Sequence, residues 1–258
     1  LTQVVPLIAQ GSTLNGQTVT GLSGARAVAA SADGKFLYVV ARTSDALSVF
    51  KLSDSAGQLR VDLVQTMTGT LGLDQAVHVL VVGNHVYVAG ANDDAIAVYA
   101  RDSVTGLVSH VESEQNGIND AGDAGGVVAG LDGVEFLVAS PDGAHLYALS
   151  GASGSIAAFD RNVANGRLSW RSVQDGISLG APMAGAASAV FSGDGASLYV
   201  TAADANAVVV LDRDASSASG SYGNLTYAGS LEQGVDGVQG LLAPTRAALA
   251  ADGNHLYV

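Results

Sequence analysis

Short apolar runs recur along this chain, and each one follows a polar turn that contains glycine. Five runs end in or pass through a tyrosine, at Tyr38, Tyr87, Tyr147, Tyr199 and Tyr257. Asp-Gly stands in the turn before four of these tyrosines, and Gly-Asn before Tyr87. Short apolar runs bounded by such turns are typical of β-hairpins. A repeat of roughly 50–60 residues is typical of a repeated supersecondary unit, so most of the recurring residues are expected to be architectural.

Positions at fixed distances from each tyrosine predict four strands in every unit. In the first unit we expect them at about 26–30, 36–41, 46–52 and 59–67, where Val, Phe, Tyr and Thr favour a pleated surface. No segment sustains a helical period. The prediction is therefore an all-β fold: a β-propeller of four-stranded antiparallel blades, with four complete blades plus partial ones in this chain.

The same spacing predicts where the blades lie. We expect blades at about 22–67, 71–112, 131–173 and 183–231, and partial blade strands at 1–10 and 241–258. Residues 1–10 resemble 225–233, the end of a blade, and the chain stops just after a second strand. An exposed final edge favours pairing with further strands. The partner predicted on this basis is the remainder of a longer chain, or a second segment, that completes the ring.

Composition narrows the function classes. The formal net charge is −13, from 11 Lys plus Arg against 24 Asp plus Glu. Nucleic-acid binding needs a basic footprint, and adsorption to an anionic membrane needs cationic groups, so neither is predicted. The absence of Cys excludes disulfides and Cys-ligated zinc. No apolar run reaches the ~20 residues of a spanning helix, so membrane insertion is not expected.

Several segments resemble the YVTN/lactonase-like bacterial β-propeller repeat family. They are Leu198-Tyr-Val-Thr201, the turn Ser140-Pro-Asp-Gly143, and the third strands at 95–102 and 207–214. The resemblance implies the propeller fold and leaves two function classes open, sugar-lactone hydrolases and secreted or surface binding proteins. The composition of the chain, rich in Ala and in acidic residues, is more similar to that of the second class.

We therefore predict a non-catalytic binding or scaffold module of a bacterial secreted or cell-surface protein. Its expected partner is a protein or a glycan in an adhesion-type interaction, and its expected location is extracellular, with the periplasm as the alternative. The alternative function is a lactonase-like hydrolase acting on a sugar lactone. The first strands of the blades would carry its site, and Arg26, Glu135 and Arg246 are the polar candidates there. That set is sparse for acid–base chemistry, and no nucleophile motif is present, so no catalytic residue is predicted.

Acidic loops give the candidate ligand-binding face. Loops between second and third strands, and the connectors between blades, vary in length on a constant scaffold, which is where binding usually resides. The candidates are Asp45, Asp93, Asp94, Asp120, Asp123 and Asp204. Such carboxylates could bind Ca²⁺, the only cofactor considered. The competing interpretation is that they are Asx or left-handed turn positions that begin the third strands.

Two further sets of recurring residues have structural explanations. His85, His145 and His255 share one repeat position, which could indicate a metal site, but Phe36 and Ser197 occupy the same position, so an architectural role is favoured. Arg101, Arg161 and Arg213 recur at the ends of third strands. We expect them to form local ion pairs with aspartates close by in sequence.

Overall fold

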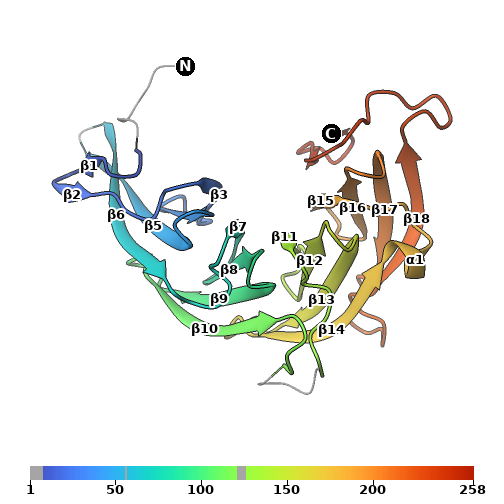
Figure 1. The fold of residues 1–258 in the computed structure, drawn as a ribbon, viewed down its shortest axis with the longest axis horizontal. Helices are drawn as coiled ribbons and strands as arrows, with labels where there is room; N and C mark the ends of the chain where they lie inside the picture. The colour runs from blue at the N-terminus through green and yellow to red at the C-terminus, as the bar shows by residue number, and fades with distance from the viewer. Residues whose placement is uncertain (1–7, 56, 121–125) are drawn as a thin grey trace. The chain divides into compact units, whose positions relative to one another are not determined.

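The computed structural model describes residues 8–55, 57–120 and 126–258. Almost all regular structure in these residues is β, and the one helix found there is the single turn α1, Gly176–Leu179. The chain forms two compact units, Leu1–Ser113 and Glu114–Val258. Each unit contains antiparallel four-stranded sheets of the kind that make propeller blades (Figure 1). The predicted all-β propeller fold is confirmed.

Unit 1 carries two four-stranded sheets, ordered β3-β4-β5-β6 and β7-β8-β9-β10, and a small hairpin β1-β2 before them. Strand β10 runs past the end of the unit. The strands are β1 (Thr13–Leu14), β2 (Gln17–Thr18), β3 (Ala25–Ala30), β4 (Phe36–Ala41), β5 (Ala46–Ser55), β6 (Gln58–Thr68), β7 (Ala76–Val82), β8 (His85–Gly90), β9 (Ala95–Arg101) and β10 (Val108–Gln115).

Unit 2 carries the sheets β11-β12-β13-β14 and β15-β16-β17-β18, with the two-stranded sheet β19-β20 after them. Helix α1 lies in the connector that follows β14. The strands are β11 (Val134–Ala139), β12 (His145–Ser150), β13 (Ser155–Arg161), β14 (Leu168–Asp175), β15 (Ala186–Phe191), β16 (Ser197–Ala202), β17 (Ala207–Arg213), β18 (Leu225–Glu232), β19 (Ala248–Leu249) and β20 (Leu256–Tyr257).

The N-terminal stretch differs from the expectation of one outer strand at 1–10. Residues 1–7 lie outside the described residues, and 8–10 are not in a strand. The hairpin β1-β2, which the repeat pattern does not predict, follows with register Thr13↔Thr18. Its Asn15-Gly16 turn has positive φ at both residues, 53° and 83°, the geometry that Asn-Gly favours in a tight hairpin.

The first strand of every four-stranded sheet begins with a bulge. The ladder skips one residue near the start of β3, β7, β11 and β15. The skipped residues are Arg26, Val77, Glu135 and Ala187. A bulge leaves its extra residue outside the ladder and redirects the side chain. Each four-stranded sheet thus has one side chain, at the start of its first strand, that departs from the regular pleat.

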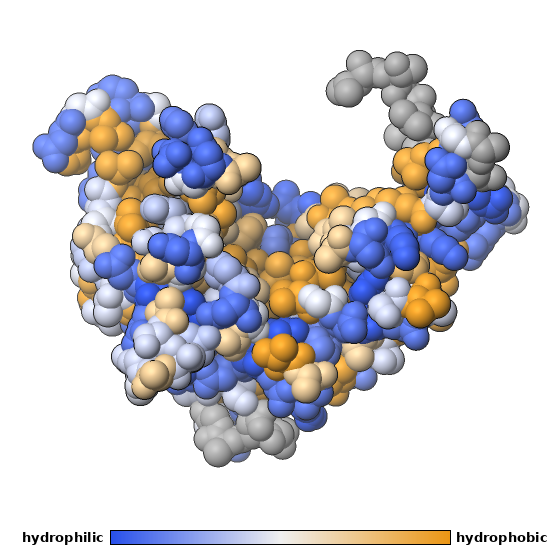
Figure 2. Space-filling view, turned by 180° about the vertical axis from the view of Figure 1, so that it is seen from behind, coloured by the Kyte–Doolittle hydropathy of each residue, from blue (hydrophilic) through white to orange (hydrophobic). Residues whose placement is uncertain are grey.

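Two of the recurring tyrosines, Tyr38 and Tyr147, fill the seams between the neighbouring four-stranded sheets of units 1 and 2. Tyr38 and Tyr147 have no exposed surface. The Tyr38 hydroxyl donates to the Gly106 carbonyl at 2.9 Å, and the Tyr147 hydroxyl donates to the Gly223 carbonyl at 2.6 Å. Both carbonyls belong to the turn before the last strand of the next sheet. The outer surface of the units is mixed, with hydrophobic patches among hydrophilic residues (Figure 2).

Two of the three arginines at the ends of third strands, Arg101 and Arg213, form ion pairs with aspartates far away in the sequence, whereas local pairs were predicted. Arg101 pairs with Asp33 at 3.4 Å, and Arg213 pairs with Asp142 at 2.6 Å. In both cases the carboxylate comes from the Asp-Gly turn of the preceding sheet. The side chains of both arginines are almost fully buried. For these two arginines the expectation of local ion pairs was wrong, because the seam brings together residues that are far apart in sequence.

Candidate functional site

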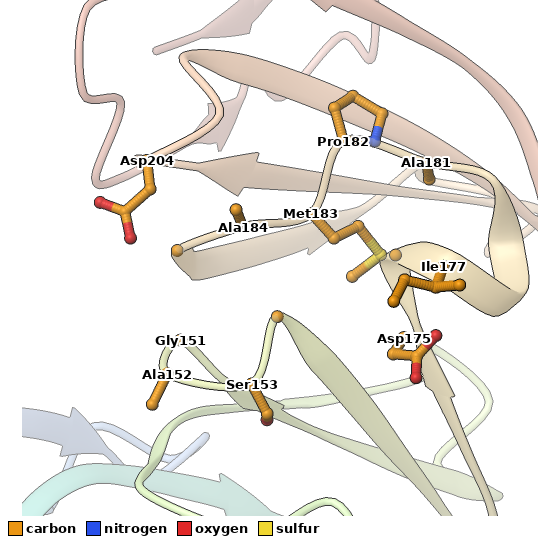
Figure 3. Close-up of a pocket in the computed structure, with 13 residues that line it drawn as sticks. Gly151, Ala152, Ser153, Asp175, Ile177, Ala181, Pro182, Met183, Ala184 and Asp204 are labelled. Atoms are coloured by element: carbon orange, nitrogen blue, oxygen red, sulfur yellow. The ribbon is translucent and has the colours of Figure 1, made fainter.

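A pocket of about 400 Å³ opens between the two four-stranded sheets of unit 2. It lies where the loops between second and third strands meet the connector between sheets (Figure 3). The walls are formed by 151–154, 175–177, 181–185 and Asp204. Asp204 and Asp175 stand at opposite ends of it, with the backbone of Met183 and Ala184 between them (Figure 3).

Glycines bring the walls of this pocket together. Gly154 has φ +57°, and a Cβ there would lie 2.9 Å from the Met183 carbonyl oxygen. A Cβ on Gly176 would lie 2.7 Å from the Ala181 carbonyl oxygen. Real Cβ atoms do not approach backbone this closely, so the pocket in this form requires glycine at both positions.

Unit 1 has an equivalent pocket of about 480 Å³, and two of the predicted ligand-binding aspartates line it. Asp93 Oδ2 accepts hydrogen bonds from the backbone N–H groups of Gly72 and Asp74, at 2.6 and 3.1 Å. Asp45 Oδ1 accepts from the Gln75 N–H at 2.9 Å. The Asp45 carboxylate therefore fastens the start of the next sheet, and the Asp93 carboxylate fastens the start of its own sheet.

The expected left-handed turn geometry is found at the end of the loops between second and third strands. Asp45, Asp94, Gly154 and Asn206 have φ of 46°, 50°, 57° and 54°. Asn206 repeats the contact made by Asp45, since its Oδ1 accepts from the Ala243 N–H at 2.9 Å. At this repeat position the residue adopts a left-handed turn conformation, and in Asp45 and Asn206 its side chain also accepts a hydrogen bond from the backbone of the following segment.

The remaining candidates of the acidic face are dispersed. Asp204 is an exposed member of the unit 2 pocket. Asp120 is only 8% exposed, and its Oδ2 accepts a hydrogen bond from the Trp170 N–H at 3.0 Å. It fixes the long connector against β14. Asp123 lies outside the described residues. A ligand-binding role for this set stays a prediction.

In the described part of the chain, no three His, Asp or Glu side chains converge on a point where they could hold a metal ion. His145 is instead buried in the seam of unit 2. Its Nδ1 lies 2.9 Å from Arg213 Nη2, and its ring meets Tyr222 edge-on at 4.5 Å between centroids. The Ca²⁺ expectation remains untested.

A second polar cluster lies at the bulged start of the first strands in unit 2. Glu135 occupies the bulge of β11, is exposed, and has its carboxyl carbon 3.4 Å from where a Gly151 Cβ would stand. The same Cβ position is 3.4 Å from the Ala186 carbonyl oxygen, at the start of β15. Gly151 also lines the 400 Å³ pocket, so the Glu135 carboxylate lies at the edge of that pocket.

Arg246 approaches the same start of β15 from the segment before β19. Its Nη1 donates to the Ala187 carbonyl at 3.1 Å, and its guanidinium lies over the Phe136 ring at 5.5 Å. The neighbouring Ala247 N–H donates to Ser188 Oγ at 3.1 Å, and Ser188 in turn bonds the Thr201 hydroxyl at 2.9 Å. The Arg246 guanidinium is thus fixed by the Ala187 carbonyl and the Phe136 ring, and Arg246 is nevertheless exposed to solvent.

This cluster supplies two complementary groups. A carboxylate can accept a proton from water, and a guanidinium can bind an oxyanion, a carboxylate or a phosphate. The sequence singled out Glu135 and Arg246 for their position on the first strands, together with Arg26, which occupies the equivalent bulge of β3 in unit 1. It gave no indication of Ser188, Thr201 or the backbone carbonyls that orient Arg246, because these are ordinary residues of a strand.

Comparison with known proteins agrees with this architecture. Residues 2–123 match the family model described as Lactonase, 7-bladed beta-propeller. Among solved structures, the periplasmic gluconolactonase PpgL of Pseudomonas aeruginosa is 20% identical, with a TM-score of 0.61 over 81% of this chain and 54% of that chain. A putative 6-phosphogluconolactonase of Bacteroides uniformis is 19% identical, with a TM-score of 0.52 over 89% of this chain and 76% of that chain. A protein of Lactobacillus plantarum is 18% identical, with a TM-score of 0.61 over 89% and 62%.

A search of curated proteins gave no match. The fold defines the chain as a β-propeller, and its N-terminal part resembles the lactonase propellers. At these identities the structural likeness establishes the fold alone. The chain spans 54% and 62% of the lengths of the Pseudomonas and Lactobacillus proteins.

These comparisons correct the main functional prediction. The expected non-catalytic binding or scaffold module of a secreted or cell-surface protein was wrong, since the family model that matches is a lactonase model and the similar solved structures include a gluconolactonase. The alternative, a lactonase-like hydrolase, has their support. The error came from reading an Ala-rich, acidic surface style as a functional signal, although surface composition reports on solubility and not on chemistry.

Proposed function

We propose that this chain is part of a lactonase-like propeller that hydrolyses a sugar lactone, with Glu135 and Arg246 in its site. One observation carries the proposal: an exposed carboxylate and an anchored guanidinium both lie at the start of β15, beside an open pocket. The lactonase family model and the gluconolactonase neighbour support the same reaction class.

The two groups fit the chemistry of ester hydrolysis. Glu135 would take a proton from a water molecule as the water oxygen adds to the lactone carbonyl carbon. The oxyanion formed there would be stabilised by the Arg246 guanidinium, whose position is already fixed by Phe136 and the Ala187 carbonyl. Collapse of the intermediate breaks the ring C–O bond, and the proton passes to the ring oxygen, giving the open hydroxy acid.

The adjoining pocket suits a polyhydroxylated substrate. Backbone groups of 151–154 and 181–185, the Ser153 hydroxyl and the Asp204 carboxylate line it, and these donors and acceptors can bond sugar hydroxyls. Its volume of about 400 Å³ lies within the range of small-ligand sites. We place the substrate ring over Gly151, with its carbonyl toward Glu135.

We also propose a periplasmic location. The Pseudomonas relative is a periplasmic protein. Among the described residues, no helix is long and apolar enough to cross a membrane. Cell fractionation of a native source tests the location.

The function is tested by measuring acid release from gluconolactone at constant pH, after subtraction of spontaneous hydrolysis. Glu135→Gln should lower kcat by roughly 100-fold or more, the usual contribution of a general base. Arg246→Gln should lower kcat by a similar factor. Asp212→Asn, an exposed carboxylate on β17, is the matched control and should leave kcat unchanged. Full activity in the Glu135→Gln protein would disprove the assigned roles.

A further inference from the structure

A second pocket of unit 2 opens between the last strands of its two four-stranded sheets, β14 and β18. Its volume is about 520 Å³. We call it the outer-strand pocket, and its walls are formed by Ala158, 171–174, Ser178 and 223–225. None of these residues lines the pocket beside Glu135, so the two pockets are separate sites.

The corresponding place in unit 1 is closed by a glutamine. Gln65 of β6 faces Val49 of β5, next to the bulge of this strand pair. Its Nε2 donates to the Val108 carbonyl at 2.9 Å, and its Oε1 accepts from the Val108 N–H at 2.7 Å. Val108 is the first residue of β10. The Gln65 side chain therefore fills the space between the last strands of the two sheets.

Unit 2 has smaller side chains at both of these positions. Ser172 of β14 faces Ala158 of β13, next to the corresponding bulge. Serine is shorter than Gln65, and alanine is smaller than Val49. These two exchanges leave open the space that unit 1 fills, and the outer-strand pocket is the result.

The same exchanges leave a buried backbone donor at the pocket wall. Leu225 is the first residue of β18, as Val108 is of β10, and it is only 2% exposed. Gln174 Nε2 donates to the Leu225 carbonyl at 2.9 Å. Among the described residues, no side chain accepts from the Leu225 N–H, whereas the Val108 N–H is bound by Gln65. A buried donor of this kind favours a ligand oxygen beside it.

A bulge turns Arg171 into the same pocket. The β13-β14 ladder skips this residue, and the extra residue of a bulge has its side chain redirected. The side chain is 23% exposed. Its Nε donates to Asn224 Oδ1 at 3.1 Å, and its Nη1 donates to Asp160 Oδ1 at 2.8 Å. These contacts orient the guanidinium and leave Nη2 for a ligand.

The polar groups at the pocket include both donors and acceptors. Arg171 Nη2 and the Asn224 amide nitrogen can donate, since the Asn224 oxygen already accepts from Arg171. Gln174 Oε1 can accept, because Nε2 of the same amide is used on the Leu225 carbonyl. The Ser172 hydroxyl can do both. Such a mixture matches a ligand with several hydroxyl groups.

The charge of the site favours a neutral ligand. Arg171 is the one ionisable residue among the described residues that line the pocket, and Asp160 balances its charge. The chain has a formal net charge of −13, which repels anions. A cation would find no carboxylate in the lining.

We propose that the outer-strand pocket binds a neutral saccharide. Sugar hydroxyl oxygens accept hydrogen bonds from Arg171 Nη2 and the Leu225 N–H, and a neighbouring hydroxyl donates to Gln174 Oε1. The volume of about 520 Å³ lies within the range of small-ligand sites. The proposal does not depend on the proposed lactonase function, because the two pockets share no lining residue.

The test titrates D-glucose and cellobiose into the isotope-labelled protein and follows the Leu225 amide and Arg171 Nε–H resonances. We expect saturable shifts at both. The Asp204 amide reports separately on the pocket beside Glu135. Sodium gluconate, an anion of similar size, should bind at the Leu225 site roughly 10-fold or more weakly than glucose, because it is repelled by the net charge. Saturable shifts with gluconate alone would show an anion site and overturn the proposal.

A filling variant locates the bound sugar. Ser172→Gln places in unit 2 the side chain that closes unit 1, so it should occupy the pocket and accept from the Leu225 N–H. We expect sugar binding to weaken by roughly 10-fold or more, since hydrogen bonds to the ligand are lost. Ser109→Gln, at an exposed position of β10, is the matched control and should bind as the unaltered protein does.

A second variant keeps the test valid if the filled protein does not fold. Arg171→Gln removes the Nη2 donor without filling the pocket, and it should also weaken sugar binding by roughly 10-fold. Unchanged affinity in the Arg171→Gln protein would overturn the assigned site. The absence of saturable shifts at Leu225 with both sugars would overturn the saccharide pocket itself.

Discussion

Arg213 and Asp142, which lie 71 residues apart in the chain, meet at 2.6 Å in the seam of unit 2. The guanidinium also lies over the Tyr222 ring at 5.2 Å and donates to the Tyr147 hydroxyl. Burial alone would raise the pKa of Asp142, but hydrogen bonds from Ser140, the Ala144 N–H, Arg213 and Tyr222 outweigh it and hold that pKa well below its usual range.

The first prediction concerns the strength of this seam. Asp142→Asn should lower the free energy of unfolding by about 1–2 kcal/mol, because the buried Arg213 loses its charged partner while Asp142 itself is partly exposed. Urea unfolding measures it. Arg60, the partner of Asp62, is exposed where Arg213 is buried, so Asp62→Asn is the matched control and should cost less than about 1 kcal/mol. Equal losses for the two variants would contradict a special role for the seam.

The second prediction is the acid dependence of stability. The folded-state pKa of Asp142 is depressed, so its contribution is complete above the unfolded-state pKa of about 3.9 and is lost as pH falls toward the folded value. Unfolding measured by urea from pH 6 to pH 3 should show a steep loss of stability. The Asp142→Asn protein should show a shallower one. Parallel curves would mean that other carboxylates govern acid unfolding.

The third prediction concerns His145. Its burial, and next the Arg213 charge, lower the pKa of the imidazole. Since arginine only donates, Nδ1 must accept, and the ring is neutral with Nε2–H directed to Asp160 Oδ1 at 3.4 Å.

The facing charges are Arg213, Arg171, Asp160 and Asp142. Stability should be full above the unfolded pKa of about 6.5 and decrease as pH falls below it. His145→Gln should flatten the unfolding free energy between pH 7 and 5. A His110→Gln control, an exposed histidine, should not.

The fourth prediction separates two aspartates of the acidic face. Asp120→Ala should lower stability by about 1–3 kcal/mol, because the Trp170 N–H loses its acceptor in a buried site. Asp204→Ala should change stability by less than about 0.5 kcal/mol, since the residue is exposed. Thermal unfolding of both variants measures the difference. A larger loss for Asp204→Ala would reverse the assignment.

The fifth prediction tests the glycine that shapes the unit 2 pocket. Gly154→Ala should destabilise the protein by about 1–2 kcal/mol, because its φ is +57° and the new Cβ would press on the Met183 carbonyl. Gly193→Ala, where a Cβ would meet nothing within 4 Å, should be neutral or slightly stabilising. Chemical denaturation compares the two. A neutral Gly154→Ala would show that the pocket wall moves freely.

The sequence by itself determined the local elements, because local signals are enough for them. Asp-Gly turns and short apolar runs placed β4, β12 and β16 beside their partners, and the repeat spacing required one sheet per sequence repeat. Of the five recurring tyrosines, Tyr38, Tyr87 and Tyr147 are fully buried, whereas Tyr199 is half-buried and Tyr257 is exposed. It also marked Glu135 and Arg246 as unusual polar residues on first strands.

Tertiary structure alone decided which of these residues meet. Arg213 is adjacent to Asp212 and Asp214 in sequence, yet its ion-pair partner is Asp142. The packing of neighbouring sheets, and not the spacing along the chain, determines which carboxylate the guanidinium meets. The sequence predicts that Asp120 is a loop carboxylate, but in the structure its side chain is buried and accepts a hydrogen bond from the Trp170 N–H. Glu135 and Arg246 come from segments over 100 residues apart, and both face the start of β15 because bulges and sheet packing turn them there, which no linear pattern records.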